Sequence, residues 1–409
     1  MQTFLDPSLK DTADGREAEA ILRSCVHCGF CNATCPTYQL LGDERDGPRG
    51  RIYLIKEMLE HNTATRETQV HLDRCLTCRS CETTCPSGVQ YNRLLEIGRG
   101  LVEKYVERPL IEQLKRKALL ETVPEPKRFK PLLRLGKLAR PVLPGSLKNK
   151  LPQLAQHREP WPDNPHPRSV LLLEGCVQSV THPQINAAAA RLLDRLGVRA
   201  HPASGCCGAL SHHMSEEEKT LDSARRNIDA WWAMIEAGAE AVLLTATGCA
   251  PTVMDYGRLL ADDPVYSKKA SRLASMAMDI SEFFEGLDLS PLTLEKPQTT
   301  PIAFHAPCSL QHALKKPGHV ESLLGRLGFE LVPVADAHLC CGSAGAYSIL
   351  QKDLSNRLLE NKLKNLEVGK PTLIATANIG CLAHLQTAAT VPVRHWIELV
   401  HDLEYSPAR

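Results

Sequence analysis

The arrangement of the cysteines constrains this chain more than any other feature of its sequence. Among its 409 residues there are 16 cysteines, and the first eight form two copies of the pattern C-x2-C-x2-C-x3-C-P. These eight are Cys25, Cys28, Cys31, Cys35, Cys75, Cys78, Cys81 and Cys85. This spacing is typical of loops that bind cubane 4Fe-4S clusters, in which one tight loop supplies three thiolates and the fourth comes from elsewhere. The sequence therefore predicts two 4Fe-4S clusters in its first quarter.

Each cluster is expected to take ligands from both copies of the motif. Where two such loops occur together, the fourth cysteine of one commonly binds the cluster held by the other. We therefore predict cluster one on Cys25, Cys28, Cys31 and Cys85, and cluster two on Cys75, Cys78, Cys81 and Cys35. Two structural zinc sites are the alternative, although a tetrahedral zinc site usually takes two C-x-x-C pairs from separate knuckles.

The residues between the two copies predict a helical domain. The connection is 39 residues long, and within it Ile52, Ile55 and Leu59 repeat at helical spacing, which predicts a helix over 50–59. The sequence GPRGR at 47–51 predicts a turn before this helix. Its two arginines either offset the charge of a cluster or lie in a solvated helix start. Residues 1–105 look like the helical two-cluster ferredoxin domain of iron-sulfur subunits in respiratory dehydrogenases.

The other eight cysteines form a second repeat. Cys176, Cys206-Cys207-Gly208 and Cys249 recur as Cys308, Cys340-Cys341-Gly342 and Cys381, at offsets of 132, 134 and 132 residues. The sequence LLDRLGV at 192–198 also recurs, as LLGRLGF at 323–329. Duplication of one unit is the simplest account. We call the two units module 1 (residues 168–295) and module 2 (residues 296–409).

Each module is predicted to be an α/β unit with a parallel sheet. Apolar segments predict strands at 169–173 and 241–244 in module 1, and at 301–304 and 372–375 in module 2, with helical stretches between them. Ligands of such sheets gather at the carboxyl ends of the strands, where Cys176, Cys249, Cys308 and Cys381 fall. The expected fold class is therefore α+β and multidomain: a helical ferredoxin domain followed by two duplicated α/β Cys-Cys-Gly modules.

The four thiols of each module could bind a further iron–sulfur cluster or zinc. Paired cysteines at a glycine turn are poor core packing, which favours metal in at least one module. The alternatives are buried, inert cysteines, or a module that kept its fold and lost its metal. Histidines near these cysteine modules include His182, His212, His213, His305, His312 and His395. His305, in the sequence His-Ala-Pro-Cys, either orients a ligand or is a hydrogen-bonded histidine at a strand end.

With these motifs in view, the chain resembles the iron-sulfur subunits of bacterial glycolate oxidase over essentially its whole length. The layout is also similar to the iron-sulfur subunit of anaerobic glycerol-3-phosphate dehydrogenase and to heterodisulfide reductase relatives. In the fullest form of the Cys-Cys-Gly signature, the last element is C-x-x-C and the module holds a non-cubane cluster at a disulfide-cleaving site. Here Thr252 and His384 stand in the final position, which argues against that cluster and that chemistry.

Residues 106–167 are predicted to link the two halves of the chain. Ten of the 28 prolines lie in 122–167, and residues 104–150 contain 13 Lys or Arg against 4 Glu, in a chain with a net charge of +1. Leucines at 132, 133, 135, 138 and 143 interleave with Arg134, Lys137 and Arg140. This pattern is compatible with three roles: contact with an anionic membrane surface, docking of a partner subunit, or a solvated linker.

Other features exclude several classes of function. The balance of 48 Lys and Arg against 47 Asp and Glu, with 5% aromatic residues, argues against nucleic-acid binding. No uncharged apolar stretch reaches the roughly 18 residues of a spanning helix, and no signal-peptide core is seen, so a cytosolic chain is expected. The sequences G-x-G-x-x-G and Walker A are absent, so we expect flavin on a partner and not here.

These observations predict an electron-transfer subunit with no catalytic residue of its own. By resemblance, its partner is the FAD-binding subunit of glycolate oxidase, which oxidises glycolate to glyoxylate, with D-lactate as a second substrate. Electrons would pass to a quinone or another membrane acceptor, and the chain would lie peripherally on the cytoplasmic side of the inner membrane. The alternatives are a subunit of anaerobic glycerol-3-phosphate or lactate dehydrogenase, a heterodisulfide reductase-like catalytic subunit, and a structural metal-binding scaffold.

Overall fold

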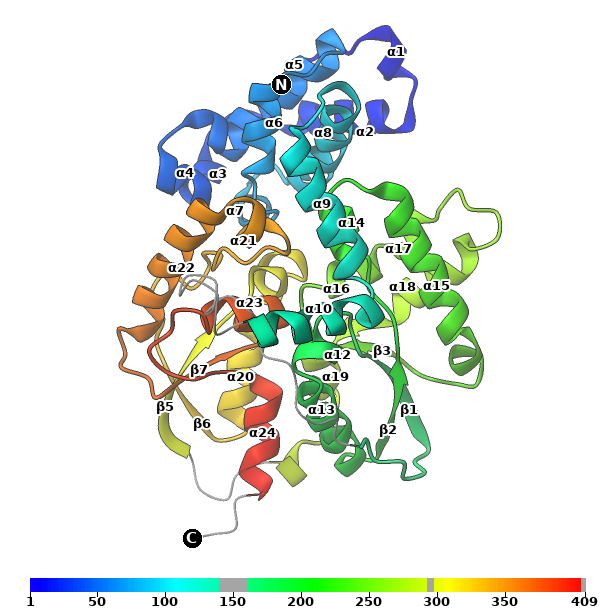
Figure 1. Cartoon of the computed structure of the whole chain (residues 1–409), viewed down its shortest axis with the longest axis vertical. Coiled ribbons are helices and arrows are strands. Elements are labelled where there is room, and N and C mark those ends of the chain that lie inside the picture. Colours follow the sequence, from blue (N-terminus) through cyan, green and yellow to red (C-terminus); the bar gives the residue numbers. More distant parts are fainter. Residues whose placement is uncertain (140–159, 293–297, 406–409) are drawn as a thin grey trace.

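The computed structural model describes residues 1–139, 160–292 and 298–405. In these residues a helical N-terminal unit lies against two α/β units, one built on strands β1–β4 and the other on β5–β8 (Figure 1). Each of the three units contacts the other two. The expected combination of a helical domain with two modules is confirmed.

Eight helices build the described N-terminal unit, and several of the shorter ones begin or end beside a cysteine. The eight helices are α1 (Pro7–Lys10), α2 (Ala13–Ser24), α3 (Phe30–Ala33), α4 (Pro36–Leu41), α5 (Pro48–His61), α6 (Arg66–Asp73), α7 (Ser80–Thr84) and α8 (Tyr91–Tyr105), with a 3-10 turn at Glu44–Asp46. Cys25 and Cys85 cap the C-terminal ends of α2 and α7. Helix α4 begins at Pro36, whose missing N–H costs nothing at the first helical position.

The core of this unit lies between α2, α5, α6 and α8. Leu22, Leu72 and Leu94 are fully buried in it. Helix α5 packs closely on α8 because residue 98 is glycine: a Cβ there would lie 2.7 Å from a side-chain carbon of Ile55. The helix predicted over 50–59 is confirmed as α5. It begins earlier than expected, at Pro48, so most of the predicted turn is the first turn of the helix.

The stretch predicted as a linker contains two helices, α9 (Leu110–Thr122) and α10 (Pro126–Ala139). Leu120 of α9 packs with Met214 of module 1, and Phe129 of α10 packs with Val180. Both helices therefore bind to the side of module 1. The interpretation of residues 140–159, including Arg140 and the leucine at 143, lies outside the described residues.

Each module contains a four-stranded parallel sheet. Module 1 contains β1 (Arg168–Leu173), α12 (Gln178–Thr181), α13 (Gln184–Arg195), β2 (Val198–Ala203), α14 (Ala209–His213), α15 (Glu217–Glu236), β3 (Val242–Leu244), α16 (Ala250–Met254), α17 (Tyr256–Leu259), α18 (Ser267–Met276), β4 (Ala277–Asp279) and α19 (Ile280–Glu285). Module 2 contains β5 (Gln298–His305), the π-helical turn η4 (Ser309–Ala313), α20 (His319–Arg326), β6 (Phe329–Val332), α21 (Tyr347–Leu350), α22 (Lys352–Glu367), β7 (Leu373–Thr376), α23 (Ile379–Leu385), β8 (Val393–His395) and α24 (Trp396–Tyr405).

The two sheets have the same topology. Their strand orders are β2-β1-β3-β4 and β6-β5-β7-β8, and every pairing is parallel. Helices cover both faces: Leu172 of β1 lies in one apolar cluster with Leu192 of α13, while Leu171 lies in another with Trp231 of α15. Matching topology supports duplication of one unit.

The predicted strands correspond to the two central strands of each sheet, β1 and β3 or β5 and β7. The edge strands β2, β4, β6 and β8 were not predicted. They are short or only half-buried, and β2 carries His201 and Pro202, so none presents the continuous apolar run that marks a central parallel strand.

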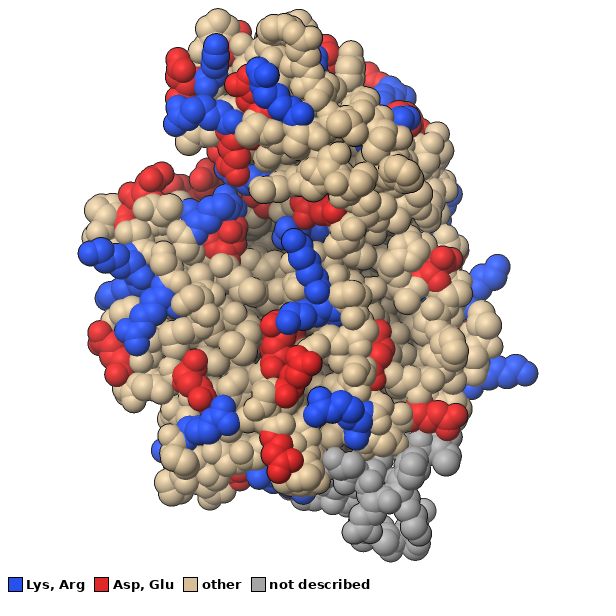
Figure 2. Space-filling view, turned by 180° about the vertical axis from the view of Figure 1, so that it is seen from behind, with Lys and Arg blue, Asp and Glu red and all other residues tan. Residues whose placement is uncertain are grey.

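The modules also share a core. Trp396, at the start of α24 in module 2, is fully buried, and its ring meets that of Phe284 of module 1 edge-on, with the centroids 5.9 Å apart. On the outer surface, basic and acidic side chains are interspersed (Figure 2). In the part of the chain that the structure describes, no helix combines the length and apolarity needed to cross a membrane.

Candidate metal centres and the cavity between them

The two four-cysteine loops have the same backbone conformation. In the first, His27 and Gly29 have positive φ values of 59° and 87°; in the second, Thr77 and Arg79 have values of 54° and 61°. These positions lie two and four residues after the first cysteine of each loop. Such alternation turns successive backbone N–H groups toward one concave side, a feature of many iron–sulfur sites. Because three of the four residues are not glycine, the strain indicates a loop shaped for a ligand.

The structure brings Cys85 to the cysteines of the first loop. Burial first, and then the charges of Cys25 and Cys85, raise the pKa of the Cys31 thiol to about 11. Cys28 acts in the same direction, so all four predicted ligands of cluster one gather at one place. Apolar side chains line the small cavity beside them: Pro48, Ile52, Pro86 and Val89.

Cys35 approaches the second loop in the same way. Burial first, and then Cys78 and Cys75, raise the pKa of the Cys81 thiol well above its usual range, and Cys35 adds to the effect. Thiols with such raised pKa values keep their protons at neutral pH unless a metal displaces them. Eight soft sulfur donors in two convergent groups of four, with N–H groups turned inward, fit two 4Fe-4S clusters.

Two polar side chains lie beside the second group. The Arg51 guanidinium is fully buried and donates to the backbone carbonyl of His71 at 2.8 Å, while its Nη1 has no hydrogen-bond partner among the described residues. Burial opposes its charge, but Tyr91, Cys75 and Cys35 raise the pKa of Arg51. The Tyr91 hydroxyl donates to Cys75 Sγ at 3.6 Å. Arg51 is therefore placed to offset charge at the second group, while Arg49 lines the cavity beside the first group and is paired with Glu44.

Each cysteine quartet of the modules lies at the carboxyl edge of its sheet. Cys176 Sγ lies 3.4 Å from Cys206 Sγ in module 1, and Cys308 Sγ lies 3.9 Å from Cys340 Sγ in module 2. The glycine after each cysteine pair is left-handed, with φ of 84° at Gly208 and 89° at Gly342. This conformation explains the Cys-Cys-Gly sequence, because other residues adopt it only with strain.

Buried hydrogen bonds hold the paired cysteines of module 1. Asn227 donates to the carbonyl of Cys206 at 2.8 Å, and the Tyr256 hydroxyl donates to the carbonyl of Cys207 at 2.9 Å. Both side chains lie far from the cysteines in sequence, so sequence reasoning did not find them.

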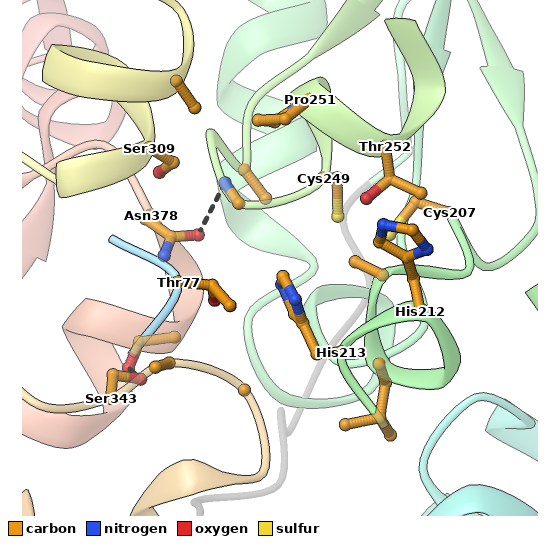
Figure 3. A pocket seen from close by; sticks show the side chains of 18 of the residues that line it. Thr77, Cys207, His212, His213, Cys249, Pro251, Thr252, Ser309, Ser343 and Asn378 are labelled. Carbon is orange, nitrogen blue, oxygen red and sulfur yellow. Dashed lines mark hydrogen bonds between the residues drawn. The ribbon is translucent and has the colours of Figure 1, made fainter. Parts of the chain in front are cut away.

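A cavity of about 1320 Å³ lies between the two quartets, and all eight of their cysteines line it. Cys207 and Cys249 face it from module 1, and Asn378 faces it from module 2 (Figure 3). Thr77 of the second loop and His213 also reach into it (Figure 3). The second loop and both modules therefore all contribute residues to this cavity.

The loop of the second group packs directly on module 2. Cys78 belongs to the same apolar cluster as Cys308 and Cys340, and after burial the charge of Cys308 is the main cause that raises the pKa of Cys78. The Tyr347 hydroxyl donates to the carbonyl of Arg74 at 3.1 Å across this contact. Module 2 is thus the immediate neighbour of the second loop.

The histidines near the cysteines have several environments. Burial lowers the pKa of His182, His213 and His395 to about 4, so these rings are neutral at physiological pH. His212 Nε2 lies 2.9 Å from the Glu96 carboxylate of α8. Burial alone would raise the pKa of Glu96, but the contact with His212 lowers it to about 2. The pair joins the N-terminal unit to module 1. Glu96 was not predicted, because its partner lies 116 residues away.

Two family models match the chain. The model of a 4Fe-4S dicluster domain matches residues 21–89, and the model of a cysteine-rich domain matches residues 170–253 and 302–386. These ranges contain the two four-cysteine loops and most of the two modules.

The chain is also similar to curated proteins. The glycolate oxidase iron-sulfur subunit of Escherichia coli (strain K12) is 54% identical over 98% of this chain and 99% of the relative. The probable glycolate oxidase iron-sulfur subunit of Bacillus subtilis (strain 168) is 32% identical over 91% of this chain and 90% of the relative. Lactate utilization protein A of Shouchella clausii is 26% identical over 58% of this chain and 100% of its own length.

Among solved structures, a hypothetical protein from Helicobacter pylori superposes with a TM-score of 0.57 at 8% sequence identity. The match covers 97% of this chain and 73% of that chain. At this identity the likeness concerns the fold alone.

Proposed function

The chain belongs to the family of glycolate oxidase iron-sulfur subunits, and from this premise we propose that it transfers electrons in a complex that oxidises glycolate to glyoxylate, with D-lactate as a second substrate. The observation that carries the proposal is the convergence of two four-cysteine groups in one helical unit, whose second loop opens onto a cavity between two further cysteine quartets. Bound clusters would supply one-electron redox steps.

The two 4Fe-4S clusters have crossed ligand sets in this proposal. Cluster one is bound by Cys25, Cys28, Cys31 and Cys85, and cluster two by Cys75, Cys78, Cys81 and Cys35. The electrostatic influence of Cys85 on Cys31, and of Cys35 on Cys81, supports this assignment. The proposed domain boundaries are 1–105 for the cluster domain, 106–167 for the connection, 168–295 for module 1 and 296–409 for module 2.

The substrate site and its flavin belong to a partner in this proposal. Because the sequence contains no dinucleotide-binding fingerprint, an FAD-binding subunit is expected to oxidise the hydroxy acid and to pass electrons singly to this chain. The oxidation releases two electrons and two protons, and the clusters accept the electrons one at a time.

The acceptor is proposed to meet the chain at a membrane surface. Helix α10 presents Leu132, Leu135 and Leu138, which are 50%, 63% and 78% exposed, together with Arg134 and Lys137. A leucine-bearing cationic helix suits the interface of an anionic bilayer. Leu132 also lines the cavity, so a quinone entering from the membrane would reach the second loop by a short path. Attachment would be peripheral, on the cytoplasmic side of the inner membrane.

The test uses the co-purified complex under anaerobic conditions. Glycolate should reduce the flavin of the partner and then produce the EPR signals of two reduced 4Fe-4S clusters in this chain. A Cys81→Ser variant should lose the cluster-two signal and electron transfer to an added quinone, while glycolate still bleaches the flavin. Cys249→Ser, outside both ligand sets, should keep both cluster signals.

Two outcomes would contradict the proposal. If the flavin is bleached while both clusters stay oxidised, the chain is not the electron carrier of the complex. If D-lactate reduces the clusters and glycolate does not, the complex is a lactate dehydrogenase, the second candidate that the lactate utilization relatives favour.

A further inference from the structure

Module 2 differs from module 1 beside its cysteines. Cys176 and Cys308 are separated by 132 residues, and at the same offset His305 corresponds to Leu173. The strand registers agree, because Leu171 pairs with Val242 as Ala303 pairs with Ile374. Module 2 therefore carries an imidazole where module 1 carries an aliphatic side chain.

Among the residues that the structure describes, the His305 side chain has no hydrogen-bond partner. It is 1% exposed at the end of β5, and neither ring nitrogen is hydrogen-bonded. An unpaired buried polar group costs about 1–3 kcal/mol, so buried polar groups almost always have partners. Leu173 needs none at the equivalent position of module 1. An unsatisfied imidazole in this place indicates a missing binding partner.

The ring lies next to two thiols. A nitrogen of His305, Cys341 Sγ and Cys381 Sγ all lie within 4.8 Å of one another. A tetrahedral zinc ion bonds to nitrogen at about 2.0–2.1 Å and to sulfur at about 2.3 Å, so its ligand atoms lie roughly 3.5–3.8 Å apart. A small contraction would therefore let one ion bind all three atoms. Among the described residues of module 1, no three donor atoms are as compact.

Neighbouring groups complete the site. Cys340 directly precedes Cys341 and is buried with it, so its thiol is the available fourth ligand; its Sγ also lies 3.9 Å from Cys308 Sγ. Asn378 Nδ2 donates to Cys381 Sγ at 3.4 Å, and the Gly342 N–H donates to Cys340 Sγ at 3.4 Å. Donors of this kind stabilise and orient thiolate ligands.

Two further side chains clarify the choice of ligands. Lys362 is 2% exposed near the quartet and donates to the carbonyl of Asp336 at 3.0 Å, and its ammonium group would offset the charge of thiolate ligands there. His384 stands in the position of the last cysteine of the full signature, but its Nε2 lies 3.1 Å from Ser355 Oγ. Because that nitrogen is already engaged, His305 is the better nitrogen ligand.

We propose that module 2 binds one tetrahedral ion of the zinc class through His305, Cys341 and Cys381, with Cys340 as the fourth ligand. Module 1, which offers thiols alone, suits iron–sulfur chemistry instead. A redox-inert ion in module 2 would cross-link the end of β5, the Cys-Cys-Gly turn and α23. It would thereby stabilise the surface on which the loop of cluster two packs. The proposal is independent of the substrate and of the partner subunit.

The test is metal analysis of the full chain, purified anaerobically, combined with X-ray absorption at the zinc edge. We expect about one zinc per chain, with a ligand shell of sulfur at about 2.3 Å and one nitrogen at about 2.0–2.1 Å. His305→Leu, which installs the module 1 residue, and Cys381→Ser should each lower the zinc content at least tenfold. His305→Cys should retain zinc with sulfur ligands only.

Cys249→Ser is the matched control, because Cys249 is the module 1 equivalent of Cys381 and should not affect zinc. The EPR signals of the two N-terminal clusters report folding of each variant. If His305→Leu does not fold, the wild-type absorption spectrum decides by itself. A wild-type chain without zinc, zinc with sulfur ligands alone, or equal loss of zinc in Cys249→Ser would overturn the proposal.

Discussion

The hydroxyl of Thr83 lies 2.9 Å from Nδ1 of His312, across the boundary between the N-terminal helical unit and module 2. His312 Nε2 lies 3.0 Å from the carbonyl oxygen of His338. Because a carbonyl only accepts, Nε2 carries the proton of the neutral ring, and Nδ1 accepts from Thr83, whose single hydroxyl hydrogen is shared with the carbonyl oxygen of Ser80 at 3.0 Å. This hydrogen bond joins α7, which carries Cys81, to the π-helical turn that follows Cys308.

Removal of the Thr83 hydroxyl should loosen this contact. We expect Thr83→Val to weaken it by about 1 kcal/mol, the usual value for one hydrogen bond. Hydrogen exchange of the backbone amides in α7 and η4 should then be several-fold faster than in the parent chain. Thr83→Ser keeps the hydroxyl and should exchange at the parent rate; equal acceleration in both variants would show that the hydrogen bond contributes nothing.

Loss of the Arg51 charge should lower the reduction potential of cluster two. The guanidinium is buried next to Cys35 and Cys75 and lies 3.5 Å from the buried Asp46 carboxylate, so with a cluster bound it would stabilise the extra negative charge of the reduced form. At an effective dielectric constant of about 20, one charge about 4 Å away changes the energy by about 4 kcal/mol, which corresponds to a change in potential of roughly 180 mV. Arg51→Gln should show this decrease in an EPR-monitored redox titration, and Arg51→Lys should largely restore the potential.

Arg49→Gln serves as the control for this experiment. Arg49 is paired with Glu44 at 2.6 Å and its side chain is 34% exposed, so solvent screens its charge. The potential of cluster two should stay within experimental error in this variant. A cluster-two potential that is the same in Arg51→Gln as in the parent chain would exclude the electrostatic role of Arg51.

The stability of module 1 should depend on pH through Asp279. Burial raises the pKa of this carboxyl to about 7, against the hydrogen bonds from Ser281, and Oδ2 has no hydrogen-bond partner in the part of the chain that the structure describes. Between pH 4 and pH 7 the folded chain holds a proton that the unfolded chain has lost, so the free energy of unfolding falls as the pH rises. Above pH 7 the decrease in the free energy of unfolding is complete.

The Asp279→Asn variant should not show this decrease in the free energy of unfolding as the pH rises. The amide oxygen still accepts from the Ser281 N–H, and no charge is buried, so the variant should be more stable at pH 8 by up to about 4 kcal/mol and nearly unchanged at pH 4. Denaturant unfolding at the two pH values measures the difference. Asp288→Asn is the control, since Asp288 accepts from Ser290 in the same way but is exposed. A stability gain of the same size at both pH values would refute this explanation.

Binding to anionic vesicles should require α10. Each Lys or Arg near such a surface contributes about 1 kcal/mol, so Arg134→Gln/Lys137→Gln should bind at least tenfold more weakly in a sedimentation assay. Leu135→Gln/Leu138→Gln should weaken binding as well, because it removes the exposed apolar side chains. Lys268→Gln/Lys269→Gln on α18 removes the same charge elsewhere and should bind like the parent chain. Unchanged binding of the α10 variants would argue for a docking or linker role.

Local spacing was enough to predict much of this protein. The cysteine intervals predicted the cluster loops, because a tight loop must present its ligands at short, regular separations. The repeat from Cys176 to Cys308 predicted the second module, and continuous apolar runs predicted the central strands. Helix α5 followed from the periodicity of Ile52, Ile55 and Leu59. In each case neighbouring residues in the sequence carry the signal.

The remaining features depend on residues that are distant in sequence. Edge strands such as β2 lack an apolar run, and their place is decided by pairing with β1. Cys78 meets Cys308 only because the N-terminal unit packs on module 2.

The sequence by itself determined which residues can bind metal and how many units the chain contains, because ligand type and repeat spacing are local properties. Tertiary structure alone decided that Arg51 is buried beside Cys35 and Cys75 and that His305 lies close to Cys341 and Cys381. The reason is physical, because side chains become buried and come together only when separate elements pack. His305 is 36 residues from Cys341 and 76 from Cys381, so no local sequence pattern predicts that they meet.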